Sequence, residues 1–516
     1  MKNNKKITKK LFIATMLFLS ANLNSAMHTV TNGNDAGAGS LREIVANANS
    51  GDTIIFASNV STVTLKEQIT IDKSLTINGG SGDKRVAIGR DTMTYGHGHG
   101  SYTIRTRIFN IPASNIEVNL NNLIIENGKT DYRSAGIDVF GGNSNKVKIT
   151  NCIFRNNTGG VHAGGRAIMI AASEVVAVNC SFEKNQSIGV GSAVCIPWDG
   201  KFIAINCIFT QNMDTIMPYD RYAVSASDNS IFIARNCIFN ENTGEGAVSV
   251  QNSSFISINN TFSENEAFYG AAIFVINNGK NSKVYLHHNT FDKNKADSSG
   301  GAIHFYGTND LYSYNSIYTA NSEKGVVSEA GQIRGTISGN GKNLIENGTT
   351  VTRDSVFGNN EYENGYIRPL AFARSATPLT KYDIEVPDGM DADDIITWLL
   401  TDQIGKDRIP DSNGFVTFGA VECDDVGIRE DGSFDVLVLP NPTDRDFNII
   451  FDNPETQKVL IDLIDLEGKS IFSIFDGVVS AGIQVYRVNE NLASGVYFVK
   501  FVFGNKVMLR KVVVRK

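Results

Sequence analysis

The chain has 516 residues, and its 47 lysines and arginines against 54 aspartates and glutamates give a formal net charge of −7 at pH 7. This length leaves room for two or three domains. The acidic balance offers no basic patch of the kind that binds nucleic acid, so nucleic acid is excluded as a partner.

Residues 1–26 have the organisation of a secretory signal peptide. Five lysines precede the apolar run 11–19, and the small residues Ser25 and Ala26 follow it. The run is too short to span a bilayer, and no later segment reaches the roughly 20 apolar residues that a spanning helix needs. We therefore predict Sec export of a mature chain without a transmembrane segment. A buried N-terminal helix is the alternative interpretation.

The segment 40–51 predicts a short capping helix. Ser40 and Glu43 form a capping box, and Gly51 can end the helix. Its apolar residues line one face, which suits a helix that covers the open end of a stack of strands. These residues are Leu41, Ile44, Val45 and Ala48. Strands at 53–56, 63–65 and 74–77 are expected to begin the stack.

The middle of the chain repeats with a period of 23 to 30 residues. Each repeat has an aromatic residue followed three positions later by asparagine, at Phe154, Phe182, Phe209, Phe239, Phe262, Phe291 and Tyr318. A second column of alanine followed by isoleucine or valine runs from Ala167-Ile168 to Ala302-Ile303. Short alternating runs between the columns are typical of half-buried strands. This pattern predicts a right-handed parallel β-helix, in which each repeat forms one coil and equivalent residues stack.

Stacking assigns a role to each column. The aromatic side chains are expected to fill the interior of the coils, where burial of each contributes roughly 1.5–3 kcal/mol. The recurrent asparagines are expected to adopt the left-handed backbone of a tight turn, and their amides to form a hydrogen-bonded ladder along the stack.

Four of the six cysteines occupy one column, two residues before the aromatic residue, at Cys152, Cys180, Cys207 and Cys237. We interpret the column as packed thiols. Disulfides between neighbouring coils and a metal site are the alternatives, although these cysteines lack the close CxxC pairing of zinc sites. No cofactor is predicted.

Two further segments resemble those of known families. DAGAGSLREI at 35–44 resembles the opening of secreted bacterial β-helix proteins. TDQIGKDR at 401–408, followed by FGAVE at 418–422, resembles the closing motif of the choice-of-anchor Q family, with Phe418 where that family usually has Asp-Ile. The resemblance covers roughly residues 30–423 and implies a fold and secretion more than an activity. We therefore expect residues 27–423 to form the β-helix with its cap and closing segment.

The pattern changes after Cys423. Residues 424–433 are acidic and are expected to be a solvated linker, and 434–516 predict a small β-sandwich of about seven strands, with turns at Asn453-Pro454 and Glu467-Gly468. LPNPT at 439–443, DLEGK at 465–469 and ASGVYFVK at 493–500 closely resemble the C-terminal sorting domain of type IX secretion in Bacteroidetes. The resemblance implies the type IX machinery as a partner, and a secreted or outer-membrane surface location after passage through the periplasm. An ordinary accessory sandwich is the alternative.

No residue belongs to a recognisable catalytic signature, so no catalytic site is assigned. The weak candidates are Glu174, Asp199 and Asp228, which occupy similar places after the Ala-Ile column in three successive coils. Lyases and glycoside hydrolases with this fold present carboxylates together on adjacent coils. Acidic residues at outward turns are also what any solvated loop supplies.

Other residues are candidates for ligand contact. Trp198, Tyr219 and Arg221 are candidates for carbohydrate contact, because an exposed aromatic ring can stack on a sugar. His97 and His99 are weak metal candidates, and incidental histidines on an inserted loop are the favoured interpretation. His287 and His288 are expected only to pack and pair.

We interpret the chain as an exported, surface-displayed β-helix protein whose long regular face serves adhesion or cell-envelope interaction, with surface polysaccharide or host glycan as the ligand. The alternative is a polysaccharide lyase or glycoside hydrolase that acts near Trp198 and Asp199.

Overall fold

The computed structural model describes residues 25–81, 84–90, 107–130, 133–141, 143–159, 164–187, 191–214, 222–244, 246–307, 309–338 and 342–347, shorter stretches from 349 to 423, and most of 436–514. The predicted signal peptide falls almost wholly outside the described residues, as does the predicted linker 424–433.

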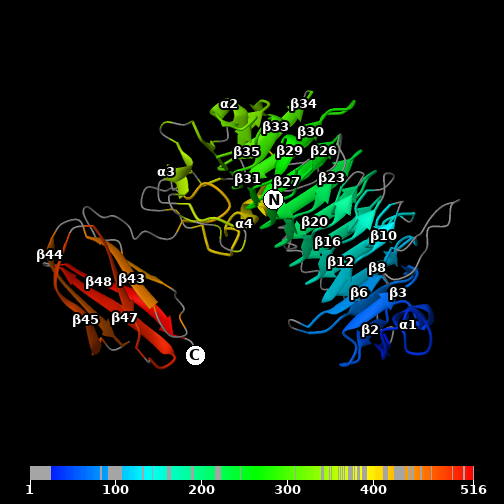
Figure 1. The fold of residues 1–516 in the computed structure, drawn as a ribbon, viewed down its shortest axis with the longest axis horizontal. Helices are drawn as coiled ribbons and strands as arrows, with labels where there is room; N and C mark the ends of the chain where they lie inside the picture. The colour runs from blue at the N-terminus through cyan, green and yellow to red at the C-terminus, as the bar shows by residue number, and fades with distance from the viewer. Residues whose placement is uncertain are drawn as a thin grey trace, which may run out of the picture.

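From Met27 to Ile345 the chain winds through a stack of coils (Figure 1). One coil runs through β12 (Lys146–Thr150), β13 (Ile153–Arg155), β14 (Thr158–Gly159) and β15 (Ile168–Ile170), and the next begins at β16 (Glu174–Val178). Each strand pairs in parallel with its counterpart one coil later. The fold is the parallel β-helix that the repeat predicts.

Three long parallel sheets run along the stack, here called sheets A, B and C in their order along a coil. The described strands of sheet A are β1 (Met27–Val30), β2 (Thr53–Phe56), β5 (Leu75–Asn78), β8 (Glu117–Asn121), β12, β16, β20 (Lys201–Ile205), β24 (Ile231–Arg235), β27 (Ser254–Ile258), β31 (Lys283–His287), β35 (Asp310–Tyr314) and β40 (Ile337–Ser338). Those of sheet B are β3 (Thr62–Leu65), β6 (Val86–Arg90), β9 (Leu123–Glu126), β13, β17 (Ser181–Glu183), β21 (Ile208–Thr210), β25 (Ile238–Asn240), β28 (Thr261–Ser263), β32 (Thr290–Asp292), β36 (Ile317–Thr319) and β41 (Leu344–Ile345). Those of sheet C are β4 (Ile69–Thr70), β7 (Phe109–Asn110), β11 (Ile137–Val139), β15, β19 (Val194–Ile196), β23 (Val224–Ser227), β26 (Val248–Gln251), β30 (Ile273–Ile276), β34 (Ile303–Tyr306) and β39 (Ile333–Arg334).

Two smaller sheets lie between sheets B and C along the chain. Sheet D contains β10 (Lys129–Thr130), β14, β18 (Gln186–Ser187) and β22 (Met213–Asp214). Sheet E contains β29 (Glu266–Tyr269), β33 (Lys295–Ser299), β37 (Ser322–Glu323) and β38 (Val326–Val327), and β38 runs antiparallel to β37.

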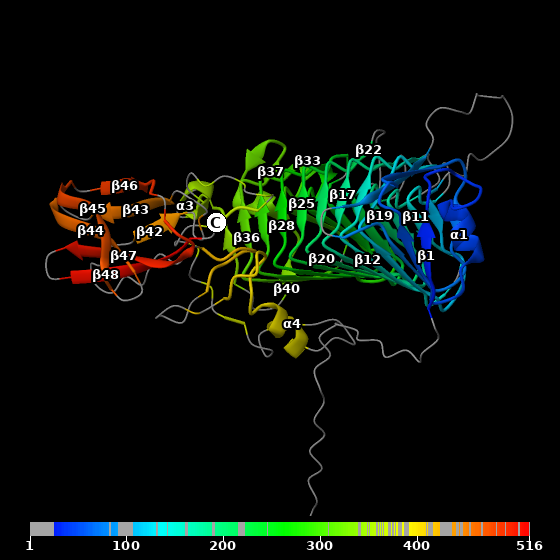
Figure 2. The same cartoon turned by 90° about the horizontal axis from the view of Figure 1, so that it is seen from below.

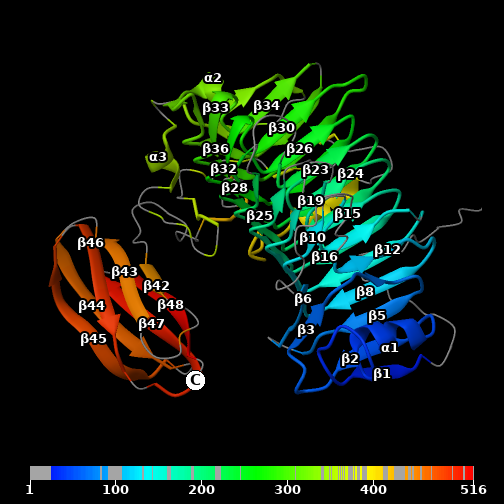
Figure 3. The same cartoon turned by 45° about the vertical axis from the view of Figure 1, so that its right-hand side comes forward.

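A short helix, α1 (Leu41–Asn47), lies beside β1 and β2 at the N-terminal end of the stack (Figure 3). The Ser40 side chain accepts a hydrogen bond from the Glu43 backbone N–H at 3.3 Å, and the Glu43 carboxylate accepts one from the Gly39 N–H at 2.6 Å. Leu41 and Val45 are buried in the main core. The predicted cap is confirmed.

The helix ends earlier than predicted. Ala48 is already extended and donates its backbone N–H to Ile44 O. Gly51, with φ of +95°, serves the turn into β2, where its N–H donates to Ser74 O. A left-handed glycine near a helix end therefore marks the next turn here, not the helix terminus.

Aromatic rings stack through the interior along sheet B. In seven successive coils each ring lies in register over the next, from Phe154 to Tyr318. Neighbouring ring centroids are 4.6–5.0 Å apart, and every ring is fully buried. A second stack of Phe202, Phe232 and Phe255 from sheet A meets the first edge-on. The predicted interior column is confirmed.

The asparagines three residues after the rings form a buried ladder. From Asn157 to Asn321, each Nδ2 donates to Oδ1 of the next asparagine at 2.7–3.0 Å. Nδ2 of Asn242 also donates to Phe209 O at 2.9 Å, and its Oδ1 also accepts the Asn212 backbone N–H at 3.1 Å. The amide hydrogens and lone pairs are thereby satisfied within the coils.

The predicted left-handed backbone is confirmed for the recurrent asparagines three residues before the ring, such as Asn151 and Asn236, and not for the ladder asparagines three residues after it. Positive φ occurs one residue before the ladder, as at Glu241, and three residues before the ring, as at Asn236. The ladder asparagines themselves are absent from the positive-φ residues of the described chain. The left-handed residue turns the chain, and the next residue can then direct its amide inward to the stacked carbonyls.

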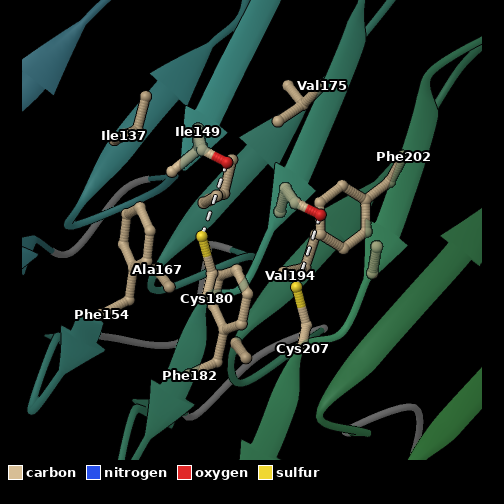
Figure 4. Close-up of a cluster of buried hydrophobic side chains, with 14 of the residues drawn as sticks. Ile137, Ile149, Phe154, Ala167, Val175, Cys180, Phe182, Val194, Phe202 and Cys207 are labelled. Atoms are coloured by element: carbon tan, nitrogen blue, oxygen red, sulfur yellow. Dashed lines mark hydrogen bonds between the residues drawn. The ribbon is translucent and has the colours of Figure 1, made fainter. Parts of the chain in front are cut away.

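The four cysteines of the column are free and buried, and Figure 4 shows two of them, Cys180 and Cys207. Sγ of Cys180 lies 3.6 Å from Ile149 O and 3.3 Å from Val178 O, so the thiol can donate a weak hydrogen bond inside the coil. Burial raises the pKa of the Cys180 and Cys207 thiols. This arrangement is that of packed thiols.

The chain beyond the last coil packs along the stack. α2 (Glu329–Gln332) precedes β39, and α3 (Arg353–Phe357) contributes Val356 and Phe357 to an apolar cluster with Ile317. α4 (Ala392–Trp398) lies beneath sheet A (Figure 2), against β24 and β27. Ile395 of α4 belongs to a buried cluster with Ile256. The outer face of sheet A is therefore apolar and covered in these coils.

The segment 401–423, which was expected to close the β-helix, binds the side of the coils. Gln403 Nε2 donates to Cys237 O at 2.8 Å, and Gln403 Oε1 accepts from the Thr261 hydroxyl at 2.6 Å. The buried Arg408 guanidinium pairs with Glu422 at 2.8 Å and donates to Asn259 Oδ1 at 3.1 Å. These contacts cover the turn between sheets A and B.

The described residues from 436 onward form two antiparallel sheets. One contains β42 (Val436–Leu439), β43 (Phe447–Asn453) and β46 (Gly482–Val488), and the other contains β44 (Gln457–Ile464), β45 (Ser470–Val479), β47 (Gly495–Phe503) and β48 (Lys506–Val514). Both sheets contribute to one apolar core, which includes Phe451 and Phe501. Gly468, with φ of +82°, lies in the turn between β44 and β45. The predicted β-sandwich is confirmed.

Candidate functional site

Alternate residues of sheet C point away from the core and form a column of mixed chemistry. In register along the stack they are Asp138, Met169, Cys195, Ser225, Ser249, Phe274, His304 and Arg334. The members from Asp138 to Ser249 are buried, and burial raises the pKa of Cys195 to about 12. Exposed groups gather near the two ends of this column.

The first group surrounds Trp198, which follows β19. Trp198 is 53% exposed, and its backbone has a φ of +48°, an uncommon conformation for a bulky residue. Its ring meets the edge of the Phe140 ring with the centroids 5.9 Å apart. The Arg133 guanidinium lies over the Phe140 ring, 3.6 Å from its centroid. Arg133, Phe140 and Trp198 are here called the Trp198 platform.

A buried carboxylate lies beside the platform. Asp138 forms an ion pair with Arg107, and its Oδ2 is 3.9 Å from Nη1 of Arg133. Burial raises the pKa of Asp138 to about 6, and the positive charges of Arg107 and Arg133 oppose this effect. Asp138 Oδ1 has no hydrogen-bond partner among the described residues. Because the side chain is inaccessible, it can position Arg133 but cannot contact a ligand.

The three candidate carboxylates do not form one cluster of equivalent positions. Glu174 begins β16, in register with Lys146 and Lys201, and forms an ion pair with Lys201 at 2.9 Å. Asp199 lies two residues before Lys201, in the turn between sheets C and A. The prediction that Glu174 occupies the same place in its coil as Asp199 and Asp228 is therefore wrong, because Glu174 is in register with Lys201.

Asp199 and Asp228 do occupy adjacent turns. Both are exposed, with φ of +59° and +54°, and the Asp199 backbone N–H donates to Asp228 O at 3.2 Å. Their carboxylates accept hydrogen bonds from the amides of Asn229 and Asn252 in neighbouring turns. These bonds give the aspartates a role in stacking the turns.

Of the remaining residues that the sequence singled out, some lie outside the described residues and the others are buried. Tyr219, Arg221, His97 and His99 lie outside the described residues. His287 is fully buried and stacks on Tyr314 with the centroids 5.3 Å apart. His288 is bonded to Thr417 O and to the Asn315 amide, and burial lowers the pKa of both histidines. Within the described chain, no group of three or more histidine, cysteine, aspartate or glutamate side chains can hold a metal ion.

The second exposed group is a pocket of about 430 Å³ near the C-terminal end of sheet C. It is lined by Ser299, His304, Phe305, Gly307, Asn309, Arg334, Gly335 and Thr336. We call it the His304 pocket. The sequence did not predict this pocket, because the residue type at its positions changes from one coil to the next. The available signal was the replacement of small residues such as Ser249 by Phe274, His304 and Arg334 in successive coils.

Comparison with protein families gives two matches. Residues 161–291 match the right-handed β-helix region, and residues 437–515 match the secretion system C-terminal sorting domain. No curated protein matches the chain. Within the described part of the chain, no helix combines the length and apolar character that crossing a membrane requires.

One solved structure with similarity is the enzymatically active domain of bacteriophage CBA120 tailspike protein 4. It is 11% identical, and the match covers 92% of this chain and 64% of that chain, with a TM-score of 0.27. The chain thus spans less than two thirds of that structure, and a likeness this distant carries no argument about activity. The family matches and the observed coils together show a right-handed β-helix region followed by a C-terminal type IX secretion sorting domain, which indicates a secreted or cell-surface protein.

Proposed function

We propose that the exported β-helix is an adhesin-like protein that binds surface polysaccharide or host glycan through the Trp198 platform. The observation that carries this proposal is the presentation of Trp198. The rings of the column from Phe154 to Tyr318 are buried in a stack, whereas Trp198 is 53% exposed at a turn between two sheets. Tyr306 on β34 is also strongly exposed, but Trp198 is the exposed ring that a second aromatic ring and a guanidinium support. An exposed indole face offers a sugar ring a broad apolar surface with few rotatable bonds to fix.

The neighbours of Trp198 support this role. Phe140 meets the indole edge-on, and Arg133 covers the Phe140 ring. Asp138 and Arg107 lie behind Arg133 in an ion-paired group. A ring that is supported in this way loses little conformational freedom on binding, so more of the contact energy contributes to affinity.

Direct binding measurements test the proposal. The exported chain and its Trp198→Ala variant would be titrated against a panel of bacterial and host polysaccharides, with Ile208→Ala as the control. Ile208 is an exposed apolar residue, 38% exposed, on sheet B. We expect Trp198→Ala to weaken binding at least about tenfold and Ile208→Ala to leave it unchanged. Equal affinities for the two variants would contradict the proposal.

The same panel addresses the alternative of a polysaccharide lyase or glycoside hydrolase. If the chain is such an enzyme, the parent should release reducing ends from a polysaccharide of the panel, and the Asp199→Asn variant should not. Asp199 accepts a hydrogen bond from the Asn229 amide at an exposed turn, so the substitution should be tolerated by the fold. Turnover that disappears in this variant would favour the enzyme over the adhesin.

A further inference from the structure

The His304 pocket lies on sheet C, separate from the Trp198 platform. Trp198 follows β19, whereas His304 is on β34, and the strands β23, β26 and β30 lie between them in the sheet. Four steps at the strand spacing of roughly 4.8 Å place the two sites about 19 Å apart along the stack. The intervening outward residues Ser225 and Ser249 are buried. The two places are therefore distinct surfaces.

The charged groups of the pocket are already matched. Arg334 donates from Nε and Nη2 to the two carboxylate oxygens of Glu323, at 2.8 and 2.7 Å. This pairing lowers the pKa of Glu323 and raises that of Arg334, so both groups stay ionised and cancel. A carboxylate or phosphate ligand would have to compete with Glu323 for the fork of the guanidinium.

His304 adds a neutral group whose one accessible ring nitrogen donates or accepts according to the tautomer. Its ring lies against Tyr269 with the centroids 4.9 Å apart and against Phe274 at 5.6 Å. Burial lowers the pKa of His304, against the opposing charge of Glu323. Nδ1 is buried and has no hydrogen-bond partner among the described residues, so Nε2 is the nitrogen left to face the pocket.

The rest of the pocket lining is uncharged and combines apolar surface with polar groups. The Phe305 ring forms an apolar wall, and Gly335 lies so close to it that a Cβ on Gly335 would be only 2.5 Å from the ring. Ser299 and Thr336 contribute hydroxyl groups, which can donate and accept. The Asn309 amide already accepts from the Ser282 N–H at 2.9 Å and donates to Tyr306 O at 3.1 Å, so it has one amide hydrogen and one lone pair left for a ligand. A volume of about 430 Å³ lies within the roughly 300–1,000 Å³ typical of small-ligand pockets.

From this combination we infer that the His304 pocket binds a neutral saccharide unit. An apolar wall suits the C–H face of a sugar ring, and each sugar hydroxyl needs partners that both donate and accept. The inference rests on the proposed glycan-binding function and adds to it a second site and a ligand class. Anionic sugars and free phosphate are disfavoured, because no positive charge in the pocket is left unmatched.

The test is saturation-transfer NMR and calorimetry on the full exported chain. The probes are glucose, galactose, mannose and N-acetylglucosamine, with glucuronate and inorganic phosphate as anionic comparators. His304→Ala removes the central side chain, and Thr336→Phe fills the pocket from an exposed rim position while every other polar group stays in place. Arg155→Ala is the matched control, because Arg155 pairs with Glu126 at 2.7 Å on sheet B.

We expect at least one neutral sugar to bind, and His304→Ala and Thr336→Phe each to weaken it at least about tenfold. Arg155→Ala and Trp198→Ala should bind it as the parent does. Absence of neutral-sugar binding, a preference for glucuronate or phosphate, or binding unaffected by both pocket variants would overturn the inference. Polysaccharide binding that is lost in Trp198→Ala, together with no neutral-sugar binding by the parent, would overturn the pocket while the platform stands. Neutral-sugar binding that is lost in the pocket variants, together with polysaccharide binding unchanged in Trp198→Ala, would overturn the platform while the pocket stands.

Discussion

Asn242 donates a side-chain hydrogen bond to Oδ1 of Asn265 at 2.9 Å, one coil further along, inside a ladder that runs through the β-helix. Both side chains are fully buried. Replacement of Asn242 by leucine would leave the Asn212 amide and the Phe209 carbonyl without their partner. Each buried polar group left unpaired costs about 1–3 kcal/mol, so we expect Asn242→Leu to destabilise the β-helix by about 3–5 kcal/mol.

Denaturant unfolding measures this effect. Asn240→Ala serves as the control, because Asn240 points outward on sheet B, where its side chain accepts from Ser263 at 3.0 Å and donates to Glu241 at 3.0 Å. A midpoint for Asn242→Leu no lower than that of the control would show that the ladder adds no stability.

The aromatic column gives a second prediction. Phe239 stacks between Phe209 and Phe262 at 4.8 and 4.6 Å, and it is fully buried. Phe239→Ala should cost about 3–5 kcal/mol, because the neighbouring coils cannot collapse into the cavity that it leaves. Ile208→Ala, which truncates an exposed residue on the same sheet, should cost less than about 1 kcal/mol. Equal unfolding midpoints for the two variants would place the ring outside the core.

The cysteine column gives a third prediction, which concerns its redox state. Cys180 and Cys207 are free, and their thiols lie against backbone carbonyls of the coils. Replacement of both by serine should leave the chain folded but less stable, since a more polar hydroxyl enters an apolar site. Reducing agent should change the unfolding midpoint of the parent little. Unfolding of the parent by reducing agent alone would instead indicate a ladder of disulfides.

His287 makes stability depend on pH. Burial lowers its pKa from the usual 6.5 to about 3, so the unfolded chain binds more protons than the folded chain between these values. Its contribution is fully present above pH 6.5 and is lost as the pH falls toward 3. Neither ring nitrogen has a hydrogen-bond partner among the described residues, so phenylalanine should fit the site without loss.

We expect the stability of His287→Phe relative to the parent to rise by about 2 kcal/mol between pH 7 and pH 5. Unfolding free energies at several pH values measure the difference. A difference that stays constant over this range would mean that His287 does not titrate against folding. The same substitution at pH 7 reports the packing effect alone.

The sequence predicts those parts of the β-helix in which equivalent residues share one environment. Phe154 and Tyr318 occupy the same place six coils apart, so their column is visible as a repeat. The Trp198 platform is not visible in this way, because Phe140 and Arg133 come from another coil and meet Trp198 only after folding. The sequence indicates Trp198 as a candidate for carbohydrate contact, but not the residues that support its ring.

Sheet A has isoleucines at positions that face outward, and the period-2 pattern alone does not explain them. Ile233 and Ile256 point outward yet are buried beneath α4, and Ile203 packs against the same cluster. Strands that are apolar on both faces are typical of a sheet with both faces covered. The asparagine ladder shows a different limit. Asparagine suits a left-handed turn and also a buried hydrogen-bonded ladder, and only the structure distinguishes Asn236 from Asn242.

We propose that the C-terminal sorting domain takes the β-helix across the outer membrane. The β-helix core and the core of the sandwich, as described, share no residue, so the β-helix should fold without residues 434–516. The decisive measurement compares the full chain with a deletion of 434–516 in a host with type IX secretion, by protease treatment and antibody labelling of intact cells and by periplasmic extraction. We expect the full chain at the surface or in the medium, and the truncated chain folded but confined to the periplasm. A truncated chain that still reaches the surface would contradict the account.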